Sequence, residues 1–156
     1  MNVLLDTNVF LRYVHKTDPL YPTVRAAITA VWASGHVPHL VPQNFYEFRV
    51  VATRPAASSG LGLTVPECVI LLQSIDTTFP VLPDAPSLLA TWRGPVARHD
   101  CKGKIAHDVR LVAAMQTHGM THLLTFNGKG LRPLSRCRRP RPRPGRRGRL
   151  RAVTST

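Results

Sequence analysis

The chain has few cysteines, few acids and no long apolar run. Its three cysteines, Cys68, Cys101 and Cys137, are widely spaced and form no Cys-x-x-Cys pair, so the sequence indicates neither a disulfide framework nor a zinc ribbon. A reducing cytoplasm is therefore the expected location. No run approaches the roughly 18 apolar residues that a membrane helix needs. An acid at position 6, with no basic segment before it, argues against a signal peptide.

Acidic residues are scarce and unevenly placed. There are eight acids against 21 lysines and arginines in 156 residues. Ten of those basic residues are arginines after Gly130, where no acid occurs, so residues 1–130 carry 11 basic and eight acidic groups, a net charge of +3. Most of the net positive charge therefore lies in the C-terminal tail. The total charge is thus only weak evidence that the folded part binds nucleic acid.

The apolar pattern alternates between short runs and helical spacing. Such alternation predicts one α/β domain over residues 1–130, with a mainly parallel sheet and helices on both faces. The chain is long enough for a substantial core and shows no internal repeat. Strands are expected at 3–5, 36–41, 79–82 and 122–126, and helices directly after Asp6 and at 21–34, 42–54, 65–77, from 84 onwards and at 106–118.

Asp6 directly follows the buried run Val3-Leu4-Leu5. Ligands of open α/β sheets bind at the carboxyl ends of the strands, so Asp6 is a candidate functional group. An equally simple interpretation is that Asp6 only caps the following helix.

Two more acids lie on helix faces that should be buried. Glu47 is flanked by apolar positions of its helix, and Asp108 shares a face with Leu111 and Met115. A buried carboxylate needs a partner or a metal. The alternatives are a structural ion pair of Glu47 with Arg49 or Arg54, and a simple helix-dipole role for Asp108.

Asn127, after the last expected strand, is either a turn residue or a neutral oxygen donor at a fourth position of the site. Three carboxylates at one sheet edge would repel each other without cations. Mg²⁺ or Mn²⁺ takes oxygen ligands and usually keeps water, and such a site suits phosphodiester hydrolysis. Lys102, Lys104 and Arg110 lie near Asp108 in the sequence and are candidate contacts for RNA phosphates.

Four stretches together resemble the PIN-domain family, and within it the VapC-type toxins. They occur in order over roughly residues 1–130 and comprise Val3-Leu4-Leu5-Asp6-Thr7-Asn8, Pro42–Phe48 with Ala52-Thr53-Arg54-Pro55, His107–Ala114 and Leu124-Thr125-Phe126-Asn127. The resemblance implies a three-layer α/β/α sandwich. It also implies a Mg²⁺- or Mn²⁺-dependent ribonuclease inhibited by a small antitoxin protein. The sequence does not decide whether the protein forms a homodimer.

The resemblance also suggests roles for single residues. Asp6, Glu47 and Asp108 match the family's acidic site, and Thr7 matches a polar residue beside it, which we take as a further candidate RNA contact. We expect Asp6 and Asp108 to bind the metal directly or through water. Glu47 is expected to bind metal or to position the attacking water.

One departure from the family pattern concerns the C-terminus. Gly130-Leu131 stands where such proteins commonly have an Asp-Phe pair, and the Arg/Pro-rich segment 131–156 follows. Like charges and prolines predict a disordered tail, either an RNA-binding arm or the product of a shifted reading frame. Two other interpretations remain: a catalytically impaired protein that binds only antitoxin or RNA, and a haloacid-dehalogenase-like phosphatase, in which Asn8 would replace an expected acid.

Overall fold

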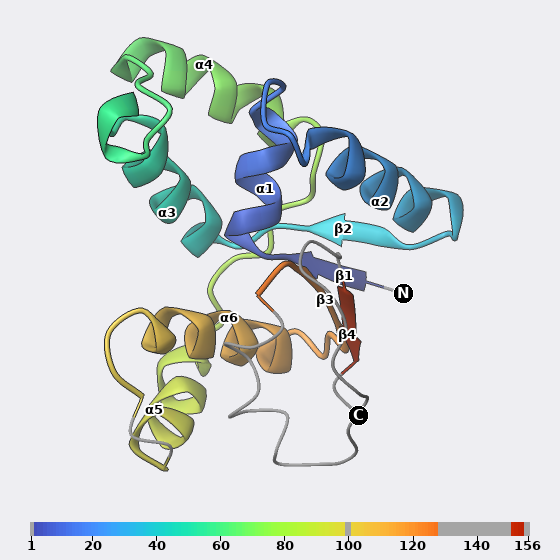
Figure 1. Ribbon diagram of the computed structural model, residues 1–156. Coiled ribbons are helices and arrows are strands. Elements are labelled where there is room, and N and C mark those ends of the chain that lie inside the picture. Colours follow the sequence, from blue (N-terminus) through green and yellow to red (C-terminus); the bar gives the residue numbers. More distant parts are fainter. Residues whose placement is uncertain (1, 99–100, 128–150, 155–156) are drawn as a thin grey trace.

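The computed structural model describes residues 2–98, 101–127 and 151–154 (Figure 1). The elements follow in the order β1 (Asn2–Leu5), α1 (Thr7–Val14), α2 (Tyr21–Ala33), β2 (Val37–His39), α3 (Pro42–Ala52), the 3₁₀ turn η1 (Ala56–Ser58), α4 (Val65–Asp76), α5 (Leu88–Arg98), α6 (Ile105–Thr117), β3 (His122–Thr125) and β4 (Arg151–Thr154). Within these described ranges no helix is long and apolar enough to cross a membrane.

The sheet has the order β2-β1-β3-β4. β1 lies in the centre, parallel to both neighbours, with Val3 opposite Pro38 and His122. β4 is antiparallel to β3. The sheet is therefore mainly parallel, as the sequence predicted, and the carboxyl ends of β1 and β3 meet at one edge.

Alternate residues of the central strands feed two separate cores. Val3 and Leu5 pack in a core with Phe10, whereas Leu4 packs in a second core with Met115. Successive strand side chains point to opposite faces, so both faces of the sheet are covered. Figure 1 shows α1 to α4 on one face and α5 and α6 on the other. The chain is a three-layer α/β/α sandwich, which confirms the predicted fold class.

Most expected helices and strands occur within a few residues of their predicted bounds, but two places differ. The strand expected at 79–82 is only an isolated bridge between Val81 and Leu40. A second difference concerns the segment 131–156. Of this segment the structure describes Arg151–Thr154, which form β4, in contrast to the disorder expected there; the rest of the proposed tail lies outside the described residues.

Candidate active site

Asp6 stands where β1 passes into α1. Its backbone N–H donates to the Leu124 carbonyl of β3 at 3.0 Å, and its side chain accepts from the Asn8 backbone N–H at 3.4 Å. The extended backbone of Asp6 (φ −72°, ψ 148°) is that of an N-cap. The capping interpretation is therefore correct, and it is compatible with a functional role because the cap lies at the carboxyl edge of the sheet.

A network of polar side chains fixes the Asp6 carboxylate. Its Oδ2 atom accepts from the Asn8 amide at 2.6 Å and from the Thr125 hydroxyl by a short hydrogen bond. The Thr125 oxygen in turn accepts from the Asn127 backbone N–H at 2.9 Å. The side-chain oxygen of Asn8 also accepts a hydrogen bond from the Phe126 backbone N–H at 3.2 Å. β1, α1 and the end of β3 are thus joined around one carboxylate.

Asp108, in the first turn of α6, lies half-buried at the same edge. The Asn127 amide donates to its Oδ2 atom at 3.3 Å. The pKa of Asp108 is raised from 3.8 to about 6, chiefly by burial and then by the negative charges of Asp6 and Glu47, against the opposing effect of His107. Asn127 therefore stands beside this acid as a donor.

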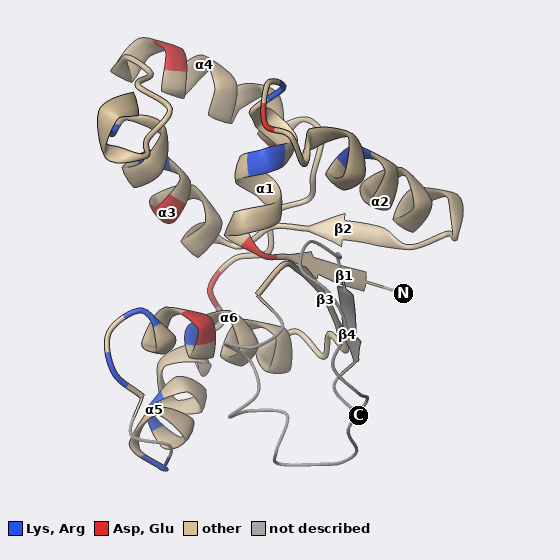
Figure 2. Ribbon diagram, in the orientation of Figure 1, with Lys and Arg blue, Asp and Glu red and all other residues tan. Residues whose placement is uncertain are grey.

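Burial likewise raises the pKa of Asp6 above its ordinary value of 3.8. The hydrogen bonds from Thr125 and Asn8 act in the opposite direction, and the charge of Glu47 adds to the increase. The carboxylates at the β1–α1 junction, on α3 and on α6 are therefore close enough for the charge of one to affect the pKa of another. Figure 2 shows acidic positions from these three parts of the chain toward the same end of the sheet.

Glu47 is paired across the two helical layers. Its Oε1 atom accepts from His107 Nδ1 of α6 at 3.0 Å and from Gln43 Nε2 of α3 at 2.8 Å. The alternative interpretation, an ion pair with Arg49 or Arg54, finds no support among the ion pairs formed within the described ranges. Glu47 therefore has partners, as the sequence argument required, but they are Gln43 of its own helix and His107 of α6.

The candidate RNA contacts differ in how exposed they are and in their partners. Thr7 is 5% exposed, and its hydroxyl accepts from the Asn44 amide at 3.2 Å, so it packs α3 on β1 and offers little surface to RNA. Arg110 forms an ion pair with Asp84 at 2.5 Å. Lys102 and Lys104 are exposed on the segment that precedes α6, and Figure 2 shows basic positions on α5 and on this segment.

The donor set of the site fits a divalent cation in chemistry and charge. All of its candidate ligands are oxygen atoms, the type that Mg²⁺ and Mn²⁺ prefer. Burial, and to a smaller extent neighbouring negative charge, raises the pKa values of Asp6 and Asp108, and both effects disfavour the ionised carboxylates in the absence of a cation. In residues 2–98, 101–127 and 151–154, however, no three His, Cys, Asp or Glu side chains are already gathered as a metal-holding group.

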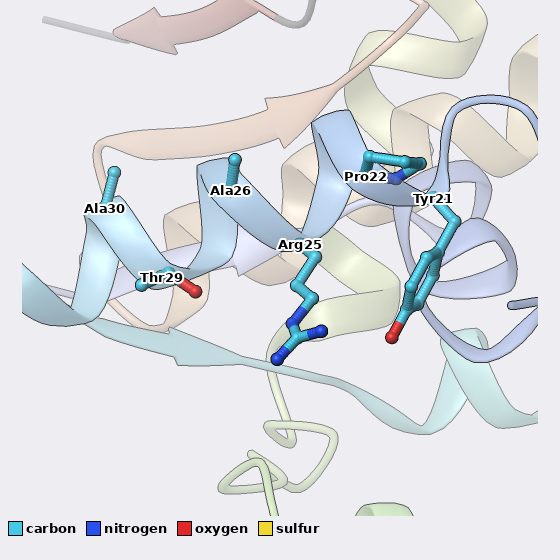
Figure 3. A pocket seen from close by; sticks show the side chains of 6 residues that line it. All are labelled: Tyr21, Pro22, Arg25, Ala26, Thr29 and Ala30. Carbon is cyan, nitrogen blue, oxygen red and sulfur yellow. The ribbon is translucent and has the colours of Figure 1, made fainter.

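Two surface hollows lie outside this acidic site. One, of about 600 Å³, runs along α2, where Tyr21, Arg25 and Thr29 are among its lining residues (Figure 3). The other, of about 360 Å³, has Trp92 in its wall and the Asp84–Arg110 pair at its edge. Arg110 links the second hollow to the acidic site, because it also donates a hydrogen bond to the side-chain oxygen of Gln43 at 3.1 Å.

Comparison with solved structures identifies the fold. VapBC2 of Rickettsia felis, in a crystal structure with a DNA fragment from its promoter, has a TM-score of 0.60 at 13% identity, over 85% of this chain and 92% of that one. VapC20 of Mycobacterium tuberculosis, a toxin that cleaves the sarcin–ricin loop, has a TM-score of 0.59 at 17% identity, over 82% and 92%. The chain has a VapC-type PIN fold. No family model and no curated protein sequence matches it.

The VapC-type fold agrees with the resemblance found in the sequence, since the four stretches of that resemblance supply β1, α3, α6 and β3. Sequence reasoning nevertheless missed Asn8, Thr125 and Gln43 as parts of the site. Asn8 and Thr125 lie close enough to the ends of β1 and β3 to be suspected. Gln43 is four residues before Glu47, which places both on one side of a helix.

Proposed function

We propose that this protein is a Mg²⁺- or Mn²⁺-dependent endoribonuclease and the toxin of a toxin–antitoxin pair. The observation that carries the proposal is the accumulation of negative charge from Asp6, Glu47 and Asp108 at the carboxyl edge of the sheet, where the pKa values of Asp6 and Asp108 are raised. Burial is the larger cause of these shifts and mutual repulsion a smaller one. Both disfavour the ionised carboxylates, and a bound cation would offset this cost. The VapC-type fold supports the same activity by analogy.

Asp6 and Asp108 would hold the cation, with Glu47 as a further ligand or as a base that orients water. When bound, the cation supplies Lewis acidity and an activated water for attack on a phosphodiester. Asn8 and Thr125 hold the Asp6 carboxylate in one orientation by hydrogen bonds. Asn127 does the same for Asp108, so both acids are preorganised before substrate binds.

The RNA backbone would approach over the basic segment before α6. Lys102 and Lys104 are exposed there, and ammonium groups contact phosphates without reading sequence. Arg110 is a third candidate, and its guanidinium forms an ion pair with Asp84.

A non-catalytic protein that binds antitoxin or RNA is the second candidate. Two observations favour it. His107 and Gln43 already hydrogen-bond the Glu47 carboxylate, and within the described ranges no three side chains are grouped so that they could hold a metal. The phosphatase interpretation has less support, because Asn8 hydrogen-bonds Asp6 as an amide where that family expects an acid.

Growth assays separate an active toxin from an inactive one. Expression of the chain alone is expected to slow growth, and co-expression with the small protein encoded next to it is expected to restore growth. Asp6→Asn expressed at the same level is the control, because it keeps the side-chain volume and removes the charge. Equal growth with wild type and with Asp6→Asn would favour the non-catalytic candidate.

A further inference from the structure

One buried amide joins the two helical layers at the acidic site. Gln43, in the first turn of α3, is 5% exposed. Its Nε2 atom donates to Glu47 Oε1 at 2.8 Å and to the backbone carbonyl of His107 in α6 at 2.9 Å. Its Oε1 atom accepts from Arg110 Nη1 at 3.1 Å. Gln43 therefore contacts three residues of the site, from both sides of the sheet.

The surroundings fix the orientation of this amide. An amide has two N–H donors and one carbonyl oxygen, and both donors of Gln43 have acceptors. The reversed orientation would place the carbonyl oxygen against the Glu47 carboxylate and the His107 carbonyl, and the NH₂ group against the Arg110 guanidinium. All three contacts would then be repulsive, so only one orientation is compatible with the neighbours.

Gln43 also separates an acid from a base. It presents its NH₂ group to Glu47 and its oxygen to Arg110, so these two charged side chains contact different atoms of the same amide. Arg110 is held on the far side by Asp84 at 2.5 Å. A direct Glu47–Arg110 ion pair would neutralise the acid and compete with a cation.

The hydrogen bonds leave half of the Glu47 carboxylate available. Gln43 and His107 both donate to Oε1. Oε2 accepts no hydrogen bond from any residue in the described ranges, so it is the atom that can take a cation or a water.

We propose that Gln43 is a positioning residue for the acidic site: it holds Glu47 by one oxygen, leaves the other for metal or water, and keeps Arg110 away from the acid. This inference rests on the proposed function. Residues that orient the ligands of a metal site in this way typically contribute about 10–100-fold to metal affinity or activity.

The first test uses the metal-free protein and needs no activity. The ¹³C resonance of the Glu47 side-chain carboxyl is compared between wild type, Gln43→Met and Gln73→Met. Gln73 is exposed on α4, so the control makes the same chemical change away from the site. The proposal expects a shift of the Glu47 resonance in Gln43→Met and none in Gln73→Met. An unchanged resonance in Gln43→Met would overturn it.

The second test asks whether Gln43 acts through Glu47. Mn²⁺ affinity is measured by calorimetry without RNA for wild type, Gln43→Met, Glu47→Gln and the double variant. We expect Gln43→Met to weaken binding about 10–100-fold and to cause little further loss once Glu47 is already Gln, since coupled residues are not additive. Equal losses in both backgrounds would show that Gln43 supports only the fold, and the proposal would be wrong.

The two tests also separate this inference from the proposed function. If the wild-type protein neither binds Mn²⁺ nor cleaves RNA, the proposed function fails, and the Glu47 resonance alone decides whether Gln43 positions the acid. If the wild type cleaves RNA, Gln43→Met should lower kcat with a smaller change in KM, while Gln73→Met retains both. A KM effect without a kcat effect would contradict a positioning role.

Discussion

Asp108→Asn is expected to stabilise the metal-free protein above about pH 6. The folded protein raises the pKa of Asp108 from 3.8 to about 6, so the folded state binds the Asp108 proton more tightly than the unfolded state does. The free energy of unfolding therefore falls as pH rises from about 4 to 6. Below this pH window Asp108 is protonated in both the folded and the unfolded state, so the free-energy cost of burying its charge disappears. Above it the cost is fully present, and the neutral asparagine removes it.

The size of the effect follows from the pKa shift. A difference of about two pKa units corresponds to somewhat under 3 kcal/mol at 1.36 kcal/mol per unit. Asp108 is only half-buried, and solvent screening reduces this to about 1–2 kcal/mol. The variant also removes a carboxylate from a helix N-terminus, which costs about 0.3–1 kcal/mol. The net gain is about 1 kcal/mol, or a melting temperature about 2–4 °C higher for a chain of this size.

Thermal melting of both proteins with a chelator, at several pH values between 4 and 8, measures this gain. The difference in melting temperature should grow between pH 4 and 6 and then level off. Added Mg²⁺ or Mn²⁺ should reduce it, because the ion stabilises the wild type more than the variant. A variant that is less stable at pH 8, or a difference that does not change with pH, would refute the electrostatic account of the site.

Two other predictions concern RNA binding and the sheet edge. Lys102→Gln combined with Lys104→Gln should weaken RNA binding and reduce its salt dependence, with a slope smaller by about 0.7 for each phosphate of a single strand that is no longer neutralised; binding titrations across salt concentrations test this, and an unchanged slope would place the RNA elsewhere. Truncation after Gly130 should lower the melting temperature, because β3 loses its pairing with β4 and becomes an exposed edge. An unchanged melting temperature would show that β4 adds nothing to stability.

Much of the fold could be predicted from local patterns. Val3-Leu4-Leu5 is apolar at every position, which is typical of a strand buried on both faces, and Leu4 and Leu5 indeed pack in different cores. The prediction of a strand at 79–82 was wrong because four apolar residues do not by themselves distinguish a strand from a connecting segment, and here only Phe79 is buried. β4 could not be predicted, since the pairing of Arg151–Thr154 with β3 joins distant parts of the chain.

The sequence drew attention to three acids of the candidate site, but not to most of their hydrogen-bond partners. Asp6 was conspicuous because it directly follows a buried strand, and Glu47 and Asp108 because each is charged on a helix face expected to be buried. The hydrogen bonds of Gln43 to His107 and of Thr125 to Asp6 span 64 and 119 residues. Such partners depend on how the layers pack, which sequence spacing alone does not reveal. Local spacing offered Arg49 or Arg54 as an alternative partner of Glu47, and this alternative was wrong.

Cleavage of RNA by the purified protein tests the central claim most directly. Single-stranded RNA is incubated with wild type, Asp6→Asn and Asp108→Asn, with Mg²⁺ or Mn²⁺ and with a chelator. The account predicts cleavage by the wild type only when the metal is present, and none by either variant although both remain folded. Cleavage that persists in the chelator, or in both variants, would contradict it and place the active site elsewhere.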